Sequence, residues 1–391
     1  MNRKFKTALT HGGLFLLTFI TTTLAGAEWV YSKSILVPGY TWNDFLSGLP
    51  YSVPFLLILS VHEFGHYFTA LYYRVRTTLP YYIPLPPLPL MLGTLGALIR
   101  IKSRIQSRTV NFDIGIAGPL AGFVVALVVL IYGYATLPPA EYIYQFHPEY
   151  EQYGLNYADQ VYRPENLPPG TVDLVIGKNL LMWLLETYVA DPARVPNPHE
   201  LIHYPLLFAG FLALVFTSLN LLPVGQLDGG HVLYGLLGFQ KHRVVASVVF
   251  CVFLFYAGLG LLLPGEELYV LSWKVPHLLS IALVVGFYYL CLGGLLLGKR
   301  DTWMYAVIIF AAQYLAIIIW PGAKGYSGWL LFAFIVGRFV RIPHPPADIE
   351  EPLSPMRQLL GWLALLIFIL CLVPNPIEFI LPESPPEGVN A

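Results

Sequence analysis

Residues 55–73 read FLLILSVHEFGHYFTALYY, an apolar run of nearly the length that crosses a bilayer, about 20 residues. Two histidines and a glutamate, His62, Glu63 and His66, interrupt it. Ionisable side chains are costly at membrane depth, so their presence there indicates a function. Positions i and i+4 share a helix face, so the H-E-x-x-H spacing predicts a metal held by both imidazoles beside Glu63. A proton relay or a hydrogen-bonded contact between helices, as in a transporter, is the alternative.

The composition indicates that lipid is the main solvent of the whole chain. Of its 391 residues, 56% are hydrophobic and 12% are charged, whereas a soluble domain carries about a quarter charged residues. The net charge of −1 gives no basic excess for nucleic acid. The three cysteines, Cys251, Cys291 and Cys371, lie scattered in apolar stretches, which argues against a metal cluster or a disulfide framework.

Apolar segments of spanning length recur along the chain. They are residues 12–30, 47–73, 113–136, 204–222, 244–263, 276–298, 302–320, 325–341 and 357–373. Pro321-Gly322 and Gly325 leave the seventh and eighth as two spans or one broken pair. The sequence therefore predicts an all-α polytopic membrane protein with about eight to nine transmembrane helices.

Basic residues concentrate in the loops that fall on one side if the spans alternate, and this side is expected to be cytoplasmic. They are Arg3, Lys4, Lys6, Arg74, Arg76, Arg100, Lys102, Arg104, Arg108, Lys241, Arg243, Lys299, Arg300, Arg338, Arg341 and Arg357. This orientation puts His62 and His66 in the cytoplasmic half of the membrane. The first span, with Ala25-Gly26-Ala27 at its end, also fits a cleaved signal peptide, but we expect a retained anchor.

Residues 79–92, LPYYIPLPPLPLML, are too rich in proline for a regular helix. Residues 97–102 alternate enough to form a short strand. Irregular backbone at membrane depth requires shielding by protein or a water-filled cavity, so we expect a re-entrant hairpin, with a plain cytoplasmic loop as the alternative. An apolar helix is expected over residues 174–189.

Residues 220–231, NLLPVGQLDGGH, offer a third ligand, because a catalytic zinc usually has three protein ligands and a water. Pro223 and Gly225 should interrupt the fourth span and leave Asp228 on bent backbone near the membrane. Alternatively, Asp228 is the N-cap of a following helix, and His231 is a rival ligand.

A second H-E-x-x-H occurs at His199-Glu200-Leu201-Ile202-His203. Pro198 can open a helix, but Pro205 opposes an ordinary continuous helix through this stretch. We expect a polar interfacial turn here rather than a metal site.

The pairing of H-E-x-x-H with a later N-x-x-P-x-x-x-L-D-G resembles the site-2 protease family of intramembrane metalloproteases. It is similar to the branch reading NLLPVGQLDGG, which has bacterial and plastid members and no inserted PDZ domain. The stretches GTLGALIRIKS (93–103) and DIGIAGPLAG (113–122) resemble the same branch. The resemblance covers residues 50–240. It implies one Zn²⁺ per chain, bound by His62, His66 and Asp228, with Glu63 as the catalytic base.

The resemblance implies zinc-dependent cleavage of membrane-protein segments, with single-span regulatory proteins as substrates and the bilayer as surroundings. A bacterial cell membrane is the expected location. Asn220 is a candidate catalytic residue, as an amide donor to the oxyanion, although it can instead bond a carbonyl freed by Pro223. A strand edge at residues 96–102 is expected to hold the unwound substrate.

The expected organisation has four parts. Residues 1–42 form an anchor span and outer loop, 43–240 the catalytic core, 241–373 additional helices, and 374–391 a disordered tail. The competing functions are an ion- or proton-coupled transporter, an inactive zinc-binding scaffold, and a prenyl-protein protease. The intact Glu63 argues against a scaffold, and a prenyl-protein protease would need a downstream helical glutamate ligand.

Overall fold

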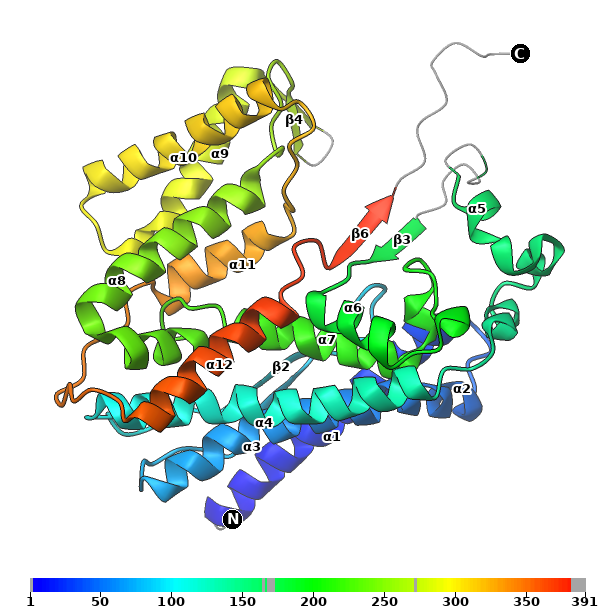
Figure 1. Ribbon diagram of the computed structural model, residues 1–391, viewed down its shortest axis with the longest axis horizontal. Helices are drawn as coiled ribbons and strands as arrows, with labels where there is room; N and C mark the ends of the chain where they lie inside the picture. Colours follow the sequence, from blue (N-terminus) through cyan, green and yellow to red (C-terminus); the bar gives the residue numbers. More distant parts are fainter. Residues whose placement is uncertain (1–2, 164–165, 167–172, 271–272, 381–391) are drawn as a thin grey trace. The chain divides into compact units, whose positions relative to one another are not determined.

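The structure is a computed structural model that describes residues 3–163, 166, 173–270 and 273–380 (Figure 1). The longer helices are α1 (Arg3–Tyr31), α3 (Leu49–Tyr72), α4 (Arg108–Ala135), α7 (Pro205–Asn220), α8 (Asp228–Gly258), α9 (His277–Leu292), α10 (Lys299–Ile319) and α12 (Pro355–Cys371). The short ones are α2 (Trp42–Ser47), α5 (Ala158–Val161), α6 (Leu180–Tyr188), α11 (Trp329–Ile335), η1 (Ala140–Gln145), η2 (Pro148–Asn156), η4 (Pro192–Arg194), η5 (Leu201–His203), η6 (Gly293–Leu295) and the π-helical η7 (Val336–Val340).

The strands form three two-stranded antiparallel sheets. The pairs are β1 (Tyr81–Pro84) with β2 (Thr94–Leu98), β3 (Asp173–Ile176) with β6 (Ile377–Ile380), and β4 (Leu268–Val270) with β5 (Trp273–Val275). The predicted helical membrane architecture is confirmed, with these small sheets added to it.

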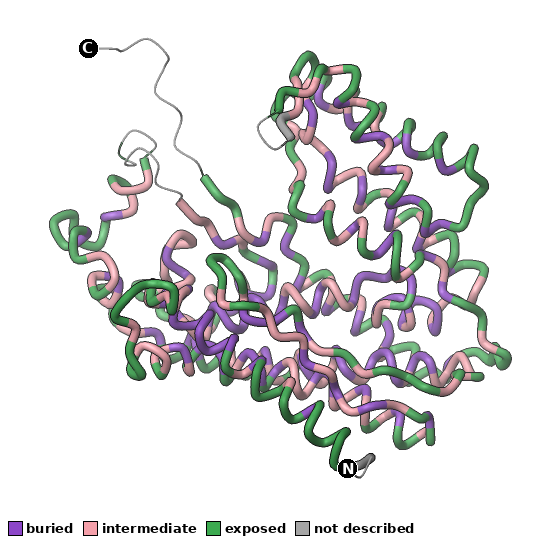
Figure 2. Tube along the Cα trace, turned by 180° about the vertical axis from the view of Figure 1, so that it is seen from behind, coloured by how far each residue is buried: buried purple, intermediate pink, exposed green. Residues whose placement is uncertain are grey.

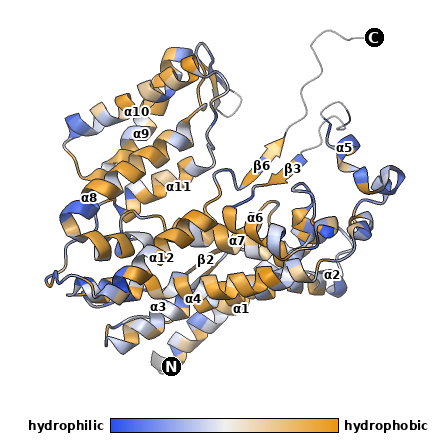
Figure 3. Cartoon of the chain, in the orientation of Figure 1, coloured by the Kyte–Doolittle hydropathy of each residue, from blue (hydrophilic) through white to orange (hydrophobic). Residues whose placement is uncertain are grey.

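Within the described residues, five helices are long and apolar enough to cross a membrane. They cover Phe5–Tyr31, Arg108–Ala135, Asp228–Gly258, His277–Leu295 and Lys299–Ile319, and Figure 3 shows their apolar character. Three shorter apolar helices lie at Pro205–Asn220, Trp329–Val340 and Pro355–Cys371. Helix α3 is in neither group, since its two histidines and its glutamate lower its mean hydropathy. The count of eight to nine spans therefore stays a prediction.

The chain divides into two compact units. Unit 1 comprises Met1–Ser103, Leu120–Leu219 and Ile369–Ala391, and unit 2 comprises Arg104–Pro119 and Asn220–Phe368. Figure 2 shows buried and exposed positions alternating along the helices of both. Many exposed side chains are large and apolar, among them Val124 and Val128 on α4 and Val248 and Val252 on α8. Such surfaces suit lipid as the surrounding solvent.

In unit 1 the proline-rich segment forms an antiparallel hairpin, β1–β2, against α1. His11 contacts the carbonyl of Pro80 at 2.9 Å, and the Trp29 indole donates to the carbonyl of Met91 at 3.0 Å. These contacts lie 18 residues apart on α1, which is about 27 Å of helix at 1.5 Å per residue. The hydrocarbon core of a bilayer is about 30 Å thick, so a spanning α1 carries the hairpin through most of that depth.

The segment between α4 and α7, residues 136–204, is named the outer segment here, and its structure corrects two expectations. Residues 174–189 are a strand followed by a helix, because Asn179 caps α6 and Gly177 packs against Asn375, whose carbonyl would lie 1.9 Å from an added Cβ. The same packing brings Ile377–Ile380 beside β3 as an antiparallel partner. The disorder expected from residue 374 is therefore wrong for β6. Residues 381–391 of the expected tail lie outside the described residues.

In unit 2 the helices beyond residue 240 pack with the start of α8 around an apolar core that includes Phe250, Leu254 and Tyr288. The Tyr288 hydroxyl donates to Gln313 at 2.9 Å, and the Gln313 amide donates to the carbonyl of Phe255 at 2.8 Å. This buried polar bridge fixes α9 and α10 against α8. The three cysteines are free thiols, and Cys291 and Cys371 are buried.

Gly93 is required where the hairpin meets α1, and its replacement tests this packing. Its φ is +79°, and an added Cβ would lie 2.4 Å from the Thr22 Cα. Gly96 is the matched control, because its φ is +106° and no described heavy atom lies within 4 Å of its added Cβ. We expect Gly93→Ala to lower the free energy of unfolding by about 1–3 kcal/mol more than Gly96→Ala, since only Gly93→Ala adds overpacking to backbone strain. Equal midpoints of denaturant unfolding in detergent would contradict this packing.

Candidate metal centre

Helix α3 holds three of the predicted site residues. A proline in its first turn favours its start, and Pro54 lies inside it. His62, Glu63 and His66 follow in the second half, where they are 6%, 5% and 6% exposed. Burial this deep requires each polar group to have a partner. The helix therefore concentrates two imidazoles and a carboxylate in the interior of unit 1.

The two imidazoles converge at their Nε2 atoms. These nitrogens lie 3.1 Å apart, with the rings 4.8 Å between centroids and inclined at 76°. Two nitrogens bound tetrahedrally to zinc at 2.0–2.1 Å lie about 3.3 Å from each other. The pair therefore fits a zinc ion without rearrangement. The Glu63 Oε1 atom is 3.9 Å from the His62 Nε2, so the carboxylate lies next to the histidine pair.

Neighbouring elements hold this face of α3 in place. An added Cβ on Gly122 of α4 would lie 3.0 Å from the Cβ of His62, so a larger residue would press on the imidazole. The Tyr82 hydroxyl of β1 lies 2.7 Å from the Ser60 hydroxyl, two residues before His62. Helix α4 and the β1–β2 hairpin thus both pack beside the His62–His66 pair.

The remaining predicted residues belong to unit 2. Asn220 ends α7, and Asp228 is the first residue of α8. Leu227 takes the N-cap position, so the alternative of Asp228 as the cap is wrong. Gly229 has to be glycine because an added Cβ would lie 1.9 Å from the carbonyl of Leu221, which folds the preceding turn tightly onto the start of α8.

His231, the rival ligand, lies in the next turn of α8. Its Nδ1 is 2.8 Å from the Nε2 of His344, so this nitrogen already has a partner within unit 2. Asp228 remains the better predicted ligand.

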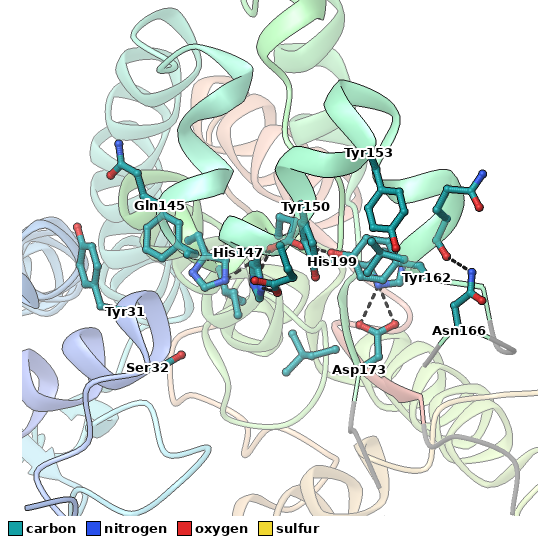
Figure 4. A pocket seen from close by; sticks show the side chains of 18 of the residues that line it. Tyr31, Ser32, Gln145, His147, Tyr150, Tyr153, Tyr162, Asn166, Asp173 and His199 are labelled. Atoms are coloured by element: carbon teal, nitrogen blue, oxygen red, sulfur yellow. Dashed lines mark hydrogen bonds and ion pairs between the residues drawn. The ribbon is translucent and has the colours of Figure 1, made fainter. Parts of the chain in front are cut away.

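The second H-E-x-x-H is not a helical metal motif. Residues 201–203 form the single 3₁₀ turn η5, and His199 turns away to contact Asp173 at 2.9 Å (Figure 4). Glu200 and His203 instead meet His147, a residue that the sequence interpretation missed. No spacing in the sequence connects His147 with residues 199–203.

Burial sets the electrostatics of this outer group. Burial, and to a smaller extent the Glu149 carboxylate, raise the pKa of Glu200 to about 8. Burial also lowers the pKa of His203 to about 4, so its imidazole is neutral near pH 7.

The part of the chain that matches a known protein family contains both H-E-x-x-H stretches. The model of peptidase family M50 matches residues 50–264. The probable zinc metalloprotease EGY1, chloroplastic, of Arabidopsis thaliana is 31% identical over 194 residues, 49% of this chain and 30% of that protein. The probable zinc metalloprotease EGY2, chloroplastic, of Arabidopsis thaliana is 27% identical over 191 residues, covering 49% and 29%.

The probable zinc metalloprotease EGY3, chloroplastic, of Oryza sativa subsp. japonica is 28% identical over 262 residues, covering 65% of this chain and 40% of that protein. The chain thus spans well under half the length of these curated relatives. No solved structure matches it. The family match covers more than half of the chain and includes both sequence motifs, and so the chain belongs to peptidase family M50, the site-2 protease family of zinc metalloproteases.

Proposed function

We propose that the chain is a zinc-dependent intramembrane endopeptidase that cleaves membrane-spanning segments of other proteins. The observation that carries the proposal is the buried His62–His66 pair, whose Nε2 atoms converge at 3.1 Å beside Glu63. A transporter can also bury such residues. Membership of a peptidase family favours proteolysis over transport.

Asp228 is the proposed third protein ligand. The carboxylate belongs to the first turn of α8, where the turn before it is fixed by two close glycine contacts, at Gly229 and Gly230. Two imidazoles and one carboxylate are a ligand set of catalytic zinc proteases, which leaves a coordination position open. Zinc in this set would supply a Lewis acid for the scissile carbonyl and lower the pKa of a bound water to about 7.

Glu63 is proposed to move the proton. Its carboxylate lies beside the ligands, at 3.9 Å from His62, where it can accept a proton from the attacking water. The same carboxyl group can then donate that proton to the leaving amine. Asn220, at the end of α7, is the proposed amide donor to the oxyanion.

Separate substitutions distinguish the proton carrier from the ligand. Glu63→Gln should lower cleavage of a model single-span substrate by at least about 10²-fold while bound zinc stays at the wild-type level, because the amide cannot take a proton. Asp228→Ala should lose cleavage together with the zinc ion bound at His62 and His66. The measurements are substrate cleavage and zinc per chain, in purified protein in detergent.

Glu151→Gln, at an exposed carboxylate of the outer segment, is the control that should keep both properties. Wild-type cleavage by Glu63→Gln would refute the proposal. A zinc content of Asp228→Ala equal to that of wild type would refute the ligand assignment alone.

Among the described strands β2 pairs only with β1, and its other edge is proposed to hold the substrate. A helical substrate hides its peptide bonds and has to unwind before attack, and main-chain pairing with an enzyme strand can hold it extended. β2 pairs with β1 in a sheet of two strands, and Leu95 and Leu98 are 62% and 47% exposed. Gly96 between them adds no side chain that would obstruct an approaching backbone.

Proline replacements test this edge, because proline cannot donate to a ladder. Leu95→Pro and Ala97→Pro should each lower cleavage of a membrane-spanning substrate, while zinc content stays unchanged. Leu95→Ala and Ala97→Ser are the matched controls for the side chains. Unchanged cleavage in both proline variants, measured at equal zinc content, would exclude pairing at β2.

The substrates are membrane proteins, and we propose that they are single-span proteins reached from the cytoplasmic half of the bilayer. The distribution of basic loops supports this orientation. The named relatives carry the word chloroplastic and lend no support to the expected bacterial cell membrane.

A further inference from the structure

A cavity of about 740 Å³ lies in the outer part of unit 1, apart from α3. Figure 4 shows His147, Tyr150, Tyr162 and His199 gathered along it, drawn from segments distant in the sequence. The side chains of Glu200 and His203 line the same cavity. These residues carry the second H-E-x-x-H, for which the proposed protease has no use.

His203 presents one nitrogen to the interior of this cluster. It is 5% exposed and stacks on Phe146 with ring centroids 4.2 Å apart. Its Nδ1 lies 2.6 Å from the carbonyl oxygen of Val30. A carbonyl only accepts, so the Nδ1 carries the proton and donates it there. The neutral ring therefore has its lone pair on Nε2, which is the form that binds metals.

His147 is held in the same way. Its ring stacks on Tyr150, with centroids 4.4 Å apart and an interplanar angle of 8°. Its Nδ1 is 3.1 Å from a Glu149 carboxylate oxygen, which fixes the proton on that nitrogen. The Nε2 lone pair then points toward Glu200. A carboxylate behind a ligating imidazole is a common feature of metal sites, because it orients the ring and raises its basicity.

Glu200 completes the arrangement. Its carboxylate is 2% exposed, and one oxygen, Oε1, accepts a hydrogen bond from the Tyr162 hydroxyl. The other oxygen, Oε2, lies 3.7 Å from the His147 Nε2 and 3.5 Å from the His203 Nε2. Two lone pairs and a carboxylate oxygen thus converge, and a cation between them would satisfy all three.

We propose that His147, Glu200 and His203 bind a second divalent transition-metal ion of the zinc class. One ligand atom from each lies within 4.8 Å of the others, close enough for a single ion. Two imidazoles and one carboxylate favour zinc-like ions, whereas calcium and magnesium prefer oxygen ligands. His147 is the least buried of the three and lines the cavity, so an ion can reach these residues from the cavity.

The alternative is a proton shared between Glu200 and one imidazole, with no ion. It predicts a single zinc per chain, bound on α3, and no response of zinc content to changes at the outer cluster. Metal content distinguishes the two arrangements without any measurement of activity.

The test uses the full chain, purified in detergent, depleted with a chelator and reloaded with Zn²⁺ alone. Wild type should hold about two zinc ions, and His147→Phe and Glu200→Gln should each hold about one. His199→Phe is the matched control. Both histidines stack on a tyrosine, but His199 contacts Asp173 and lies outside the ligand set, so its replacement should leave two ions.

A His66→Ala background separates this site from the one on α3. There the outer ion should remain, and adding His147→Phe should remove it. Zinc that is lost with His147→Phe but not with His66→Ala would support the outer site and refute the proposed protease site. Monodisperse His147→Phe and Glu200→Gln proteins with the zinc content of wild type would overturn the inference and favour the shared proton.

Glu149 provides a graded test of the outer site. Glu149→Gln keeps the shape of the side chain but weakens the acceptor behind His147, so the affinity for the outer ion should fall by about 10–100-fold. Glu151→Gln, two residues along the same segment and exposed, should leave it unchanged. The measurement is competition with a zinc chelator in the His66→Ala background, and equal affinities for the two variants would contradict the role of Glu149.

Discussion

The cost of burying ionisable groups is the constraint on which the rest of the structure depends. Helix α3 has to hold His62, Glu63 and His66 in a setting of leucine, isoleucine and phenylalanine, and none of the three is more than 6% exposed. Convergence of the two Nε2 atoms makes a divalent ion the natural compensation, since a cation satisfies both lone pairs at once. The close approach of Gly122 and the Tyr82–Ser60 contact then serve to keep this face of the helix fixed.

The outer cluster of His147, Glu200 and His203 also buries ionisable groups, but its side chains are held in place differently. On α3 the two imidazoles are neighbours because they are four residues apart on a helix. In the outer cluster they come from separate segments, and each ring is oriented by an acceptor behind its Nδ1, the Val30 carbonyl or the Glu149 carboxylate. Aromatic stacking on Phe146 and Tyr150 replaces the helix as the rigid support.

This difference explains what the sequence could predict. The His62–Glu63–His66 face follows from local helix geometry, and the helices follow from apolar runs, so both could be predicted from residue order alone. The β3–β6 pair, the break at Gly177 and the meeting of His147 with Glu200 depend on residues far apart in the chain, for which a single sequence gives no signal. In the sequence, residues 199–203 match a single H-E-x-x-H motif. In the structure, His199 contacts Asp173, whereas His203 lies close to Glu200.

The proline-rich hairpin shows how irregular backbone can lie along a spanning helix. Its five prolines, Pro80, Pro84, Pro86, Pro87 and Pro89, bring no N–H groups that would need partners in an apolar setting. The backbone carbonyls still need donors, and those of residues 91–93 accept hydrogen bonds from side chains of α1 and α3. The donors are Trp29 to Met91, Tyr51 to Leu92 and Thr21 to Gly93. Proline there thus reduces the number of unpaired donors as well as preventing a helix. The two neighbouring helices thus supply donors to these three carbonyls, which helps this stretch to remain non-helical beside α1.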